Sequence, residues 1–367
     1  MPSDLSAFTT LRVGGPAVRV IDELESESAV QTFRDVWATG EPWLVLGGGS
    51  NVVVSDEGFD GTVVLMRSAT YSAEIVGEGH GNVRLRASAG HSWDDLVALA
   101  VREGWAGIEG LSGIPGSCGA APIQNIGAYG QELASSLVGV EFLDFLTEEL
   151  VYLPAAELEL DYRTSALKGG REGVVLSIDL SLTSSPFGLS DPVAYDQLAA
   201  ALGVELGTRV ALADVRSTVL ALRASKGMVL DPTDPDSVSA GSFFTNPIVG
   251  ENFARTLPEA APRWPVEPEP VDLVVPLGEE PAVQPERTDF RVKLSAAWLI
   301  ERAGIGKGFS LPGSRAAISS KHTLAIVNTG GATAAEIAEL ARFVQTRVFS
   351  EFGVRLQHEP VFIGLTL

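Results

Sequence analysis

Residues 107–130 read GIEGLSGIPGSCGAAPIQNIGAYG, a run that contains seven glycines and two prolines. Glycine lets the backbone approach another group closely and adopt conformations that other residues rarely reach. The run has no helical or strand periodicity, and a purely structural loop seldom needs so many glycines. Gln124 and Asn125 add amide donors and acceptors that suit the edge of a heterocycle. The stretch therefore predicts a loop that lies against a bound cofactor.

A second glycine-rich segment, Gly47-Gly48-Gly49-Ser50-Asn51, lies upstream of this loop. It follows the short apolar run Trp43–Leu46 and precedes the strand-like run Val52–Val54. A Rossmann fingerprint places its glycines between a strand and a helix, so this segment does not fit that fold. The backbone N–H groups of such a loop can bind an anion without a positive side chain. Taken alone, the segment leaves an ordinary tight turn as the alternative.

The charge balance excludes several classes of protein. The chain has 367 residues, with 26 Lys+Arg against 47 Asp+Glu and a formal net charge of −21 at pH 7. This charge disfavours binding to nucleic-acid backbones and to anionic membrane surfaces. A pocket can carry its own positive field, so a small anionic ligand remains compatible with the composition.

Cysteine and histidine usage argues against disulfide and metal sites. Cys118 is the only cysteine, and the chain has four histidines, so we expect no disulfide and no metal. The N-terminal residues lack the basic region and apolar core of a signal peptide. No apolar run approaches the ~20 residues that cross a bilayer. We therefore expect a cytoplasmic monomer without membrane insertion.

Periodic patterns predict several elements. Apolar and polar residues alternate over residues 174–182, which indicates a strand with one buried face. Helices are expected from Ser92 and over residues 212–226. Thr333–Glu336 has the pattern of a capping box, and Gly353 is a suitable end for the helix that follows it.

The order of these elements predicts an α+β fold with more than one domain. Strand and glycine-turn patterns dominate before a Ser/Pro/Gly turn near residue 185, and helical patterns follow it. We therefore divide the chain into domains 1–184 and 185–355. Residues 251–290 hold eight of the 21 prolines and no periodicity, which favours a long surface excursion. Residues 356–367 are expected to form a strand that returns to the active site.

Five sequence blocks occur together and in order along nearly the whole chain. They are LGGGSNVVVSD (46–56), GLSGIPGSCGAAPIQNIGAYG (110–130), YRTSALK (162–168), GSFFTNP (241–247) and HEPVFIG (358–364). As a set they resemble the UDP-N-acetylenolpyruvoylglucosamine reductase family, flavoenzymes of peptidoglycan precursor synthesis. The resemblance implies non-covalent FAD on an N-terminal domain of the vanillyl-alcohol-oxidase (PCMH) type, followed by a C-terminal α+β substrate-binding domain. It also implies NADPH as co-substrate and UDP-N-acetylglucosamine enolpyruvate as substrate.

The family's cofactor positions fall on both glycine-rich segments. The resemblance assigns Gly47–Asn51 to the FAD pyrophosphate, which backbone N–H groups would hold in place of arginines. It assigns residues 111–130 to the flavin ring and the rest of the cofactor. The expected FAD-binding residues are Gly47, Gly48, Gly49, Ser50, Asn51, Ser112, Gly113, Pro115, Gly116, Gly119, Gln124, Asn125 and Gly127. Cys118 is expected to be a small packed residue.

Three residues match the family's catalytic positions. Arg163 would bind the substrate carboxylate, because guanidinium pairs with it bidentately and keeps its charge. Glu359 would stabilise the developing enolate, which requires a protonated carboxyl and therefore a raised pKa. Ser242 would donate the proton. Outside their blocks, these would be interpreted as a surface arginine, a solvated acid and a turn serine.

Five further residues fall on positions that the resemblance associates with the UDP-sugar. These are Tyr129, Tyr195, Arg223, Lys226 and Asn246. Arg223 and Lys226 are expected on one helical face, where they would suit a diphosphate. Tyr195 resembles the lid tyrosine of the longer, type I branch, although a core tyrosine is equally compatible. Trp264 stands near a position where many type I members have a tyrosine that reaches the diphosphate.

Two other functions share parts of this pattern. An FAD-linked sugar or alcohol oxidase would explain the glycine-rich segments but not GSFFTNP or HEPVFIG. A catalytically inactive UDP-sugar-binding protein would not need Arg163, Ser242 and Glu359 together. An NADPH-dependent reductase therefore explains more of the sequence than either alternative.

Overall fold

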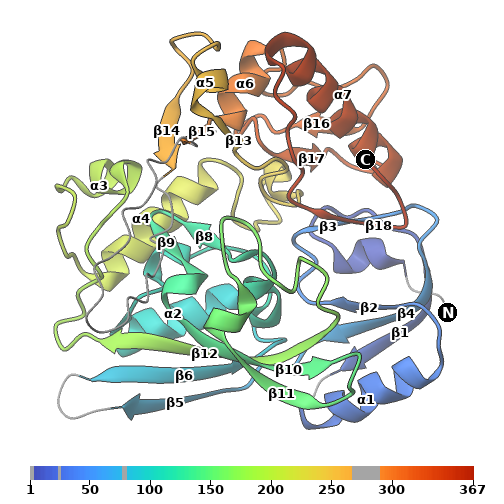
Figure 1. Cartoon of the computed structure of the whole chain (residues 1–367), viewed down its shortest axis with the longest axis vertical. Coiled ribbons are helices and arrows are strands. Elements are labelled where there is room, and N and C mark those ends of the chain that lie inside the picture. Colours follow the sequence, from blue (N-terminus) through green and yellow to red (C-terminus); the bar gives the residue numbers. More distant parts are fainter. Residues whose placement is uncertain (1–3, 24–25, 77–80, 267–289) are drawn as a thin grey trace, which may run out of the picture.

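In a computed structural model, the protein is described over residues 4–23, 26–76, 81–266 and 290–367 (Figure 1). Helices and strands mix along the chain, and the strands form both parallel and antiparallel sheets, which confirms the predicted α+β class. Within the described part of the chain, no helix is long and apolar enough to cross a membrane.

A small parallel sheet forms the N-terminal part of the fold. Its strand order is β1 (Ala17–Glu23), β4 (Phe59–Met66) and β2 (Trp43–Leu46). Helix α1 (Ser26–Ala38) packs on one face, where Phe33 and Val36 share a buried cluster with Val64. Strand β2 leads directly into the Gly47–Asn51 loop, as its apolar run predicts.

A larger antiparallel sheet follows. Its order is β11 (Leu150–Pro154), β10 (Leu137–Asp144), β12 (Gly173–Ser184), β6 (Asn82–Ser88) and β5 (Tyr71–Val76), and β7 (Trp105–Ala106) pairs with β12. Helix α2 (Trp93–Glu103) buries Trp93 and Leu96 against this sheet. The predicted start of α2 is confirmed, because the Ser92 hydroxyl accepts the Asp95 N–H at 3.4 Å.

The prediction of a single buried face for residues 174–182 was wrong. Ser177 and Asp179, which the alternation assigns to the exposed face, are only 7% and 4% exposed. Arg86 covers Asp179, with its Nε 2.7 Å from Asp179 Oδ1, and the Tyr152 hydroxyl donates to Oδ2 at 3.2 Å. Charged neighbours on adjacent strands therefore bury a carboxylate that no pattern within one strand could place.

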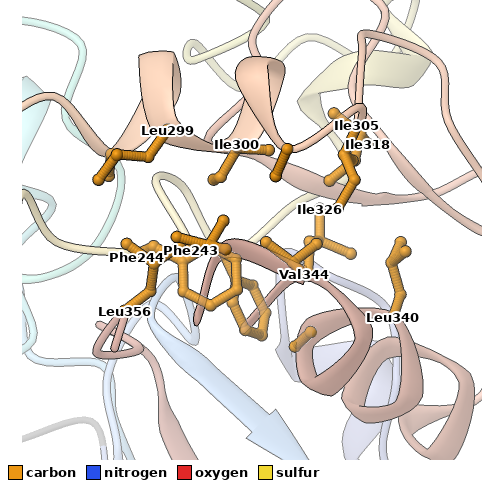
Figure 2. Close-up of a cluster of buried hydrophobic side chains, with 14 of the residues drawn as sticks. Phe243, Phe244, Leu299, Ile300, Ile305, Ile318, Ile326, Leu340, Val344 and Leu356 are labelled. Carbon is orange, nitrogen blue, oxygen red and sulfur yellow. The ribbon is translucent and has the colours of Figure 1, made fainter. Parts of the chain in front are cut away.

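The C-terminal half is organised around one buried cluster (Figure 2). Its elements are α6 (Ala296–Arg302), α7 (Ala334–Phe352), the pair β16 (Ala316–Ile318) with β17 (Ile326–Asn328), and the sheet β13 (Ile248–Gly250), β15 (Arg291–Leu294) and β14 (Arg263–Val266). Phe243 and Phe244 lie in the same cluster as Leu299 and Val344. The core thus fixes the backbone next to Ser242.

The predicted surface excursion over residues 251–290 was wrong for its first part. Residues 251–266 contain helix α5 (Glu251–Ala254) and strand β14, which pairs with β15. Ala254, Leu257 and Ala261 are buried in the C-terminal cluster, because this short apolar set packs although it has no regular period. Residues 267–289 lie outside the described residues.

Two further helices lie between the halves. Helix α3 (Asp196–Leu202) packs on α4 (Leu212–Ala224) through Leu198, Val215 and Val219. Because α4 ends at Ala224, Lys226 lies beyond the helix. The expected common helical face for Arg223 and Lys226 is therefore not formed.

The last strand of the chain pairs with a strand of the N-terminal part. Strand β18 (Val361–Ile363) pairs in parallel with β3 (Val52–Val54), and Figure 1 shows the two side by side. A second link joins the same regions, since the Asp56 carboxylate accepts the N–H groups of Ala334 and Ala335 at 2.7 and 3.0 Å. The predicted capping box of α7 is confirmed, with the Thr333 hydroxyl accepting from Glu336 N–H.

These contacts predict how α7 depends on a distant carboxylate. Asp56→Ala should lower the free energy of unfolding by roughly 1–2 kcal/mol, because two N–H groups at the helix start lose a charged acceptor. Thr333→Ala should cost about 1 kcal/mol through loss of the cap. Urea denaturation measures both, with Glu339→Ala on the exposed side of α7 as control. An Asp56→Ala variant as stable as the control would contradict this account.

Candidate active site

A cleft of about 370 Å³ lies where the glycine-rich segments meet the C-terminal part of the chain. It brings together thirteen of the residues singled out in the sequence. They are Gly47, Gly48, Gly49, Ser50, Asn51, Pro115, Gly116, Gln124, Gly127, Arg163, Arg223, Ser242 and Glu359. Ile114, from the second glycine-rich segment, adds an apolar wall, and so do Trp93 and Met228, which the sequence analysis did not connect with a site.

The two glycine-rich segments contact each other through their backbones. A Cβ on Gly48 would lie 2.6 Å from the Cα of Gly116, a distance that packed structures do not allow. Gly49 has a φ of +61° and abuts the Phe8 carbonyl. The Ser50 hydroxyl donates to the Pro115 carbonyl at 2.9 Å. Glycine is therefore required here for the close approach of two loops as well as for any ligand.

Asn51 connects three separated segments. Its amide donates to the Gln124 side-chain oxygen at 2.7 Å and to the Glu359 carbonyl at 3.3 Å. Its own carbonyl accepts the Val361 N–H at 2.9 Å. One side chain thus sets the distance between the first loop, the second loop and the end of the chain.

Arg163 lies in a strained conformation at the cleft. Its φ is +56°, which is rare for a residue with a side chain. Its Nη1 and Nη2 donate to the carbonyls of Asn125 and Gly127 at 3.2 and 2.8 Å, and its Nε is 3.3 Å from Glu359 Oε1. These contacts hold the guanidinium plane while two of its five N–H donors remain for a ligand.

Glu359 and Ser242 are brought to the cleft by one pair of adjoining segments. The Glu359 N–H donates to the Phe243 carbonyl at 2.9 Å, so Glu359 and Ser242, the residue before Phe243, lie on adjoining backbone segments. Burial raises the pKa of the Glu359 carboxyl, and this outweighs Arg163 and Lys168, which both lower it. The raised pKa agrees with the expectation of a carboxyl that holds a proton.

Lys168 is a site residue that the sequence analysis did not single out. Its Nζ donates to the Arg163 carbonyl at 3.1 Å, and its charge acts on Glu359. Lys168 is the last residue of the YRTSALK block, and its place in that block is the sequence feature that could have identified it. It both supports the strained backbone of Arg163 and adds a cation near the carboxyl.

Tyr129, Tyr195 and Lys226 form a separate group outside the lining of the cleft. The rings of Tyr129 and Tyr195 lie edge to face with centroids 5.8 Å apart, and Lys226 Nζ is 5.7 Å from the Tyr129 ring. Tyr195 is 45% exposed, so it is not the core tyrosine that the sequence left open. Tyr129 itself has a φ of +50° in the tight turn between β8 (Gly127–Ala128) and β9 (Gln131–Glu132).

The other predicted residues support the cleft without lining it. The Ser112 hydroxyl donates to the Glu109 carbonyl, and the Gly113 N–H donates to Asp94 at 2.6 Å. A Cβ on Gly119 would lie 2.5 Å from Ala89. The Asn125 amide bonds to Glu132 and to the Asp161 carbonyl, and the Asn246 side-chain oxygen accepts the Ala296 N–H. Cys118 is fully buried, and its thiol pKa is raised by that burial.

A second cavity of about 730 Å³ adjoins the cleft. The two share lining residues from β2, both glycine-rich segments and β18, among them Val45, Gly47, Ser117 and Val361. Together they offer an elongated space with apolar walls and a glycine-lined passage, which fits an extended dinucleotide such as FAD. Among the described residues, no group of three or more His, Cys, Asp or Glu could hold a metal ion.

Comparisons with known proteins agree with this geometry. A family model described as an FAD binding domain matches residues 18–152. A second, described as the C-terminal domain of UDP-N-acetylenolpyruvoylglucosamine reductase, matches residues 232–363. The predicted N-terminal FAD-binding domain is therefore confirmed.

Individual relatives span the whole chain. The UDP-N-acetylenolpyruvoylglucosamine reductase of Leifsonia xyli is 60% identical over 100% of this chain and 99% of its own length. That of Thermobifida fusca is 49% identical over 99% of this chain and 97% of its own length. The solved UDP-N-acetylenolpyruvylglucosamine reductase of Thermus caldophilus is 26% identical, with a TM-score of 0.62 over 99% of this chain and 98% of that one. The chain therefore belongs to the UDP-N-acetylenolpyruvoylglucosamine reductase family.

Proposed function

We propose that this protein reduces the enolpyruvyl group of UDP-N-acetylenolpyruvoylglucosamine to give UDP-N-acetylmuramate, with NADPH as reductant. The main support is that Arg163, Ser242 and Glu359 come from three distant segments and line one cleft beside two glycine-rich loops. Full-length similarity to relatives named for this reaction adds to it. We also propose that the protein acts in the cytoplasm as a monomer.

The cofactor of this reaction is FAD, which supplies hydride transfer between NADPH and the enolpyruvyl group when it is bound. Gly47–Asn51 and residues 115–127 would hold it, mainly through backbone N–H groups. Ser50 and Asn51 are engaged with Pro115 and Gln124, so they fix the loop around the cofactor. Nothing in this arrangement requires a covalent bond to the flavin.

Arg163 and Glu359 are suited to stabilise negative charge on the substrate. The guanidinium has two free N–H donors and cannot lose its charge, so it can bind the carboxylate of the enolpyruvyl group. Glu359 is buried against this cation, with its pKa raised by burial, and can donate a hydrogen bond in its protonated form. A cation and a neutral acid side by side favour the enolate over the ground state.

Ser242 is placed to deliver the proton that completes the reduction. It lines the cleft, and Phe243 beside it is buried and bonded to Leu324 and Glu359 through its backbone. Gly241 before it has a φ of +74°, which turns the chain into the cleft. A serine hydroxyl is a weak acid, but an enolate is basic enough to take its proton. Lys226 and Tyr195 then remain as contacts for the UDP moiety.

The two alternative functions explain less of the site. An oxidase would need no paired arginine and protonated carboxyl beside a serine, and a binding protein would need none of the three. The reductase is therefore the function that uses the whole cleft.

Anaerobic half-reactions test the proposal. The purified protein should be yellow, NADPH should bleach it, and the enolpyruvyl sugar nucleotide should restore the colour. Ser242→Ala should keep bleaching by NADPH and slow the recovery of colour by roughly 10²-fold or more, as expected for a lost proton donor. Exposed Ser217→Ala serves as the control. Rapid recovery of colour in Ser242→Ala would refute the role of this serine.

The acidity of Glu359 predicts a pH dependence. Because burial holds its pKa above the usual range, substrate-driven flavin reoxidation should be fastest at low pH and fall as pH rises through that raised pKa. Glu359→Gln should react more slowly but lose this fall, since the amide stays neutral. Stopped-flow absorbance at a series of pH values measures it, with exposed Glu351→Gln as control. A fall that persists in Glu359→Gln would show that another group titrates.

The close contact of the glycine-rich segments predicts a specific sensitivity. Gly48→Ala should lose most bound FAD, because the new methyl group would push the first loop away from Gly116. Gly250→Ala is the matched control, since a Cβ there meets open space. Flavin absorbance per protein measures the content. Normal FAD content in Gly48→Ala would show that the loops can separate without loss of the cofactor site.

A further inference from the structure

Arg223 is a cation in the cleft that the protein leaves incompletely paired. It is the next-to-last residue of α4, and its side chain lines the cleft together with Arg163 and Met228. Its Nη2 donates to the Met228 carbonyl at 2.9 Å. Its Nε is buried and has no hydrogen-bond partner among the described residues, and no described carboxylate forms an ion pair with it.

The surroundings of Arg223 do not compensate this charge. Burial lowers the pKa of Arg223, the charge of Arg163 lowers it further, and the negative charge of Asp94 opposes both. Asp94 is already engaged by Arg216 through contacts of 2.6 and 2.9 Å. A buried cation with an unmade hydrogen bond destabilises the protein unless a ligand completes it.

The second glycine-rich segment makes room for this side chain. A Cβ on Gly113 would lie 2.8 Å from a methyl carbon of Leu220 and 3.4 Å from Cδ of Arg223. Gly113 therefore contributes to the cleft by letting α4 approach the cofactor loop. The position of the Arg223 side chain depends on that approach.

We infer that Arg223 stabilises the negative charge that FAD gains when it is reduced. A hydride carries two electrons and one proton, so FAD that accepts hydride from NADPH gains one negative charge while NADPH becomes NADP⁺. A fixed charge near the ring is a means by which a protein tunes a flavin. The inference rests on the proposed function, because it takes FAD as the hydride carrier.

This inference assigns each anionic group of the ligands to a different part of the protein. Backbone N–H groups of Gly47–Asn51 serve the pyrophosphate, whose charge is the same in both redox states. Lys226 and Tyr195 lie outside the cleft lining and remain for the UDP diphosphate. Arg223, which lines the cleft with Arg163 and feels its charge, is left for the charge that appears only on reduction.

The midpoint potential of the bound flavin tests this role. Arg223→Met should bind reduced FAD at least tenfold more weakly relative to oxidised FAD, which corresponds to a potential about 30 mV lower for a two-electron couple. Arg223→Lys should restore part of the difference. Arg255→Met, an exposed arginine paired with Glu251, should leave the potential unchanged. The titration uses a chemical reductant and a reference dye at one pH.

Each other result would overturn the inference. An unchanged potential with weaker binding of oxidised FAD would assign Arg223 to the pyrophosphate. An unchanged potential with weaker binding of UDP-N-acetylglucosamine would assign it to the diphosphate. If Arg223→Met retains no FAD, Arg223→Lys and Arg223→Gln decide between these outcomes. The titration needs neither NADPH nor the sugar nucleotide, so failure of the wild-type protein to turn over substrate would refute the proposed function and leave this measurement interpretable.

Discussion

Strand β18 pairs in parallel with β3, so the last strand of the chain lies against the strand that follows the first glycine-rich loop. This pairing sets the cleft, because Glu359 lies two residues before the start of β18 and Asn51 immediately precedes β3. The Val361 N–H to Asn51 carbonyl bond fixes the register, and the Asn51 amide then bonds to both Gln124 and the Glu359 carbonyl. A shift of one residue would turn the Glu359 side chain to the other face of the strand. The first glycine-rich loop and the Glu359 carboxyl are therefore positioned by the same contact.

The backbone around the cleft is strained at three residues with side chains. Asn125, Tyr129 and Arg163 all have positive φ values, which cost free energy for residues with side chains. Two of them are held by contacts that span elements: Asn125 by Glu132 and the Asp161 carbonyl, and Arg163 by two carbonyls and by Lys168. The second loop, the Arg163 turn and the β8–β9 turn thus restrain one another. Such a network keeps charged groups in place before any ligand arrives, which is what electrostatic catalysis needs.

Local patterns were sufficient to predict most individual elements. The runs Trp43–Leu46 and Val52–Val54 and the capping box at Thr333 each carry their own signal, and they appear where the sequence indicates them. The errors came where tertiary contacts decide. Asp179 is buried because Arg86 and Tyr152 approach from other strands of the sheet. Residues 251–266 pack because Ala254, Leu257 and Ala261 meet a core built largely from later sequence.

Among the predicted site residues, some line the cleft and others from the same sequence blocks do not. Arg163, Ser242 and Glu359 were identifiable because each sits in a short, distinctive block, and the cleft contains all three. Ser112, Gly113 and Asn125 belong to an equally distinctive block but do not line the cleft, and their polar groups bond to the protein itself. A linear motif marks that a segment matters without saying which of its residues face the ligand. That distinction depends on hydrogen-bond partners such as Asp94 and Glu132, which lie before and after the 110–130 block in the sequence.

The net charge of −21 and a polyanionic set of ligands are compatible for a physical reason. A dinucleotide held by backbone N–H groups uses partial charges that no count of side chains includes, so the cleft needs few cations for binding. Arg163 pairs with Glu359, Lys168 bonds to the Arg163 carbonyl, and Arg223 lines the same cleft. Under the proposed function, these cations would act on the negative charge that appears during the reaction, while backbone N–H groups would hold the pyrophosphate. In this proposal, the backbone N–H groups of the glycine-rich loops bind the pyrophosphate, and the few arginine side chains stabilise the charge that appears during the reaction.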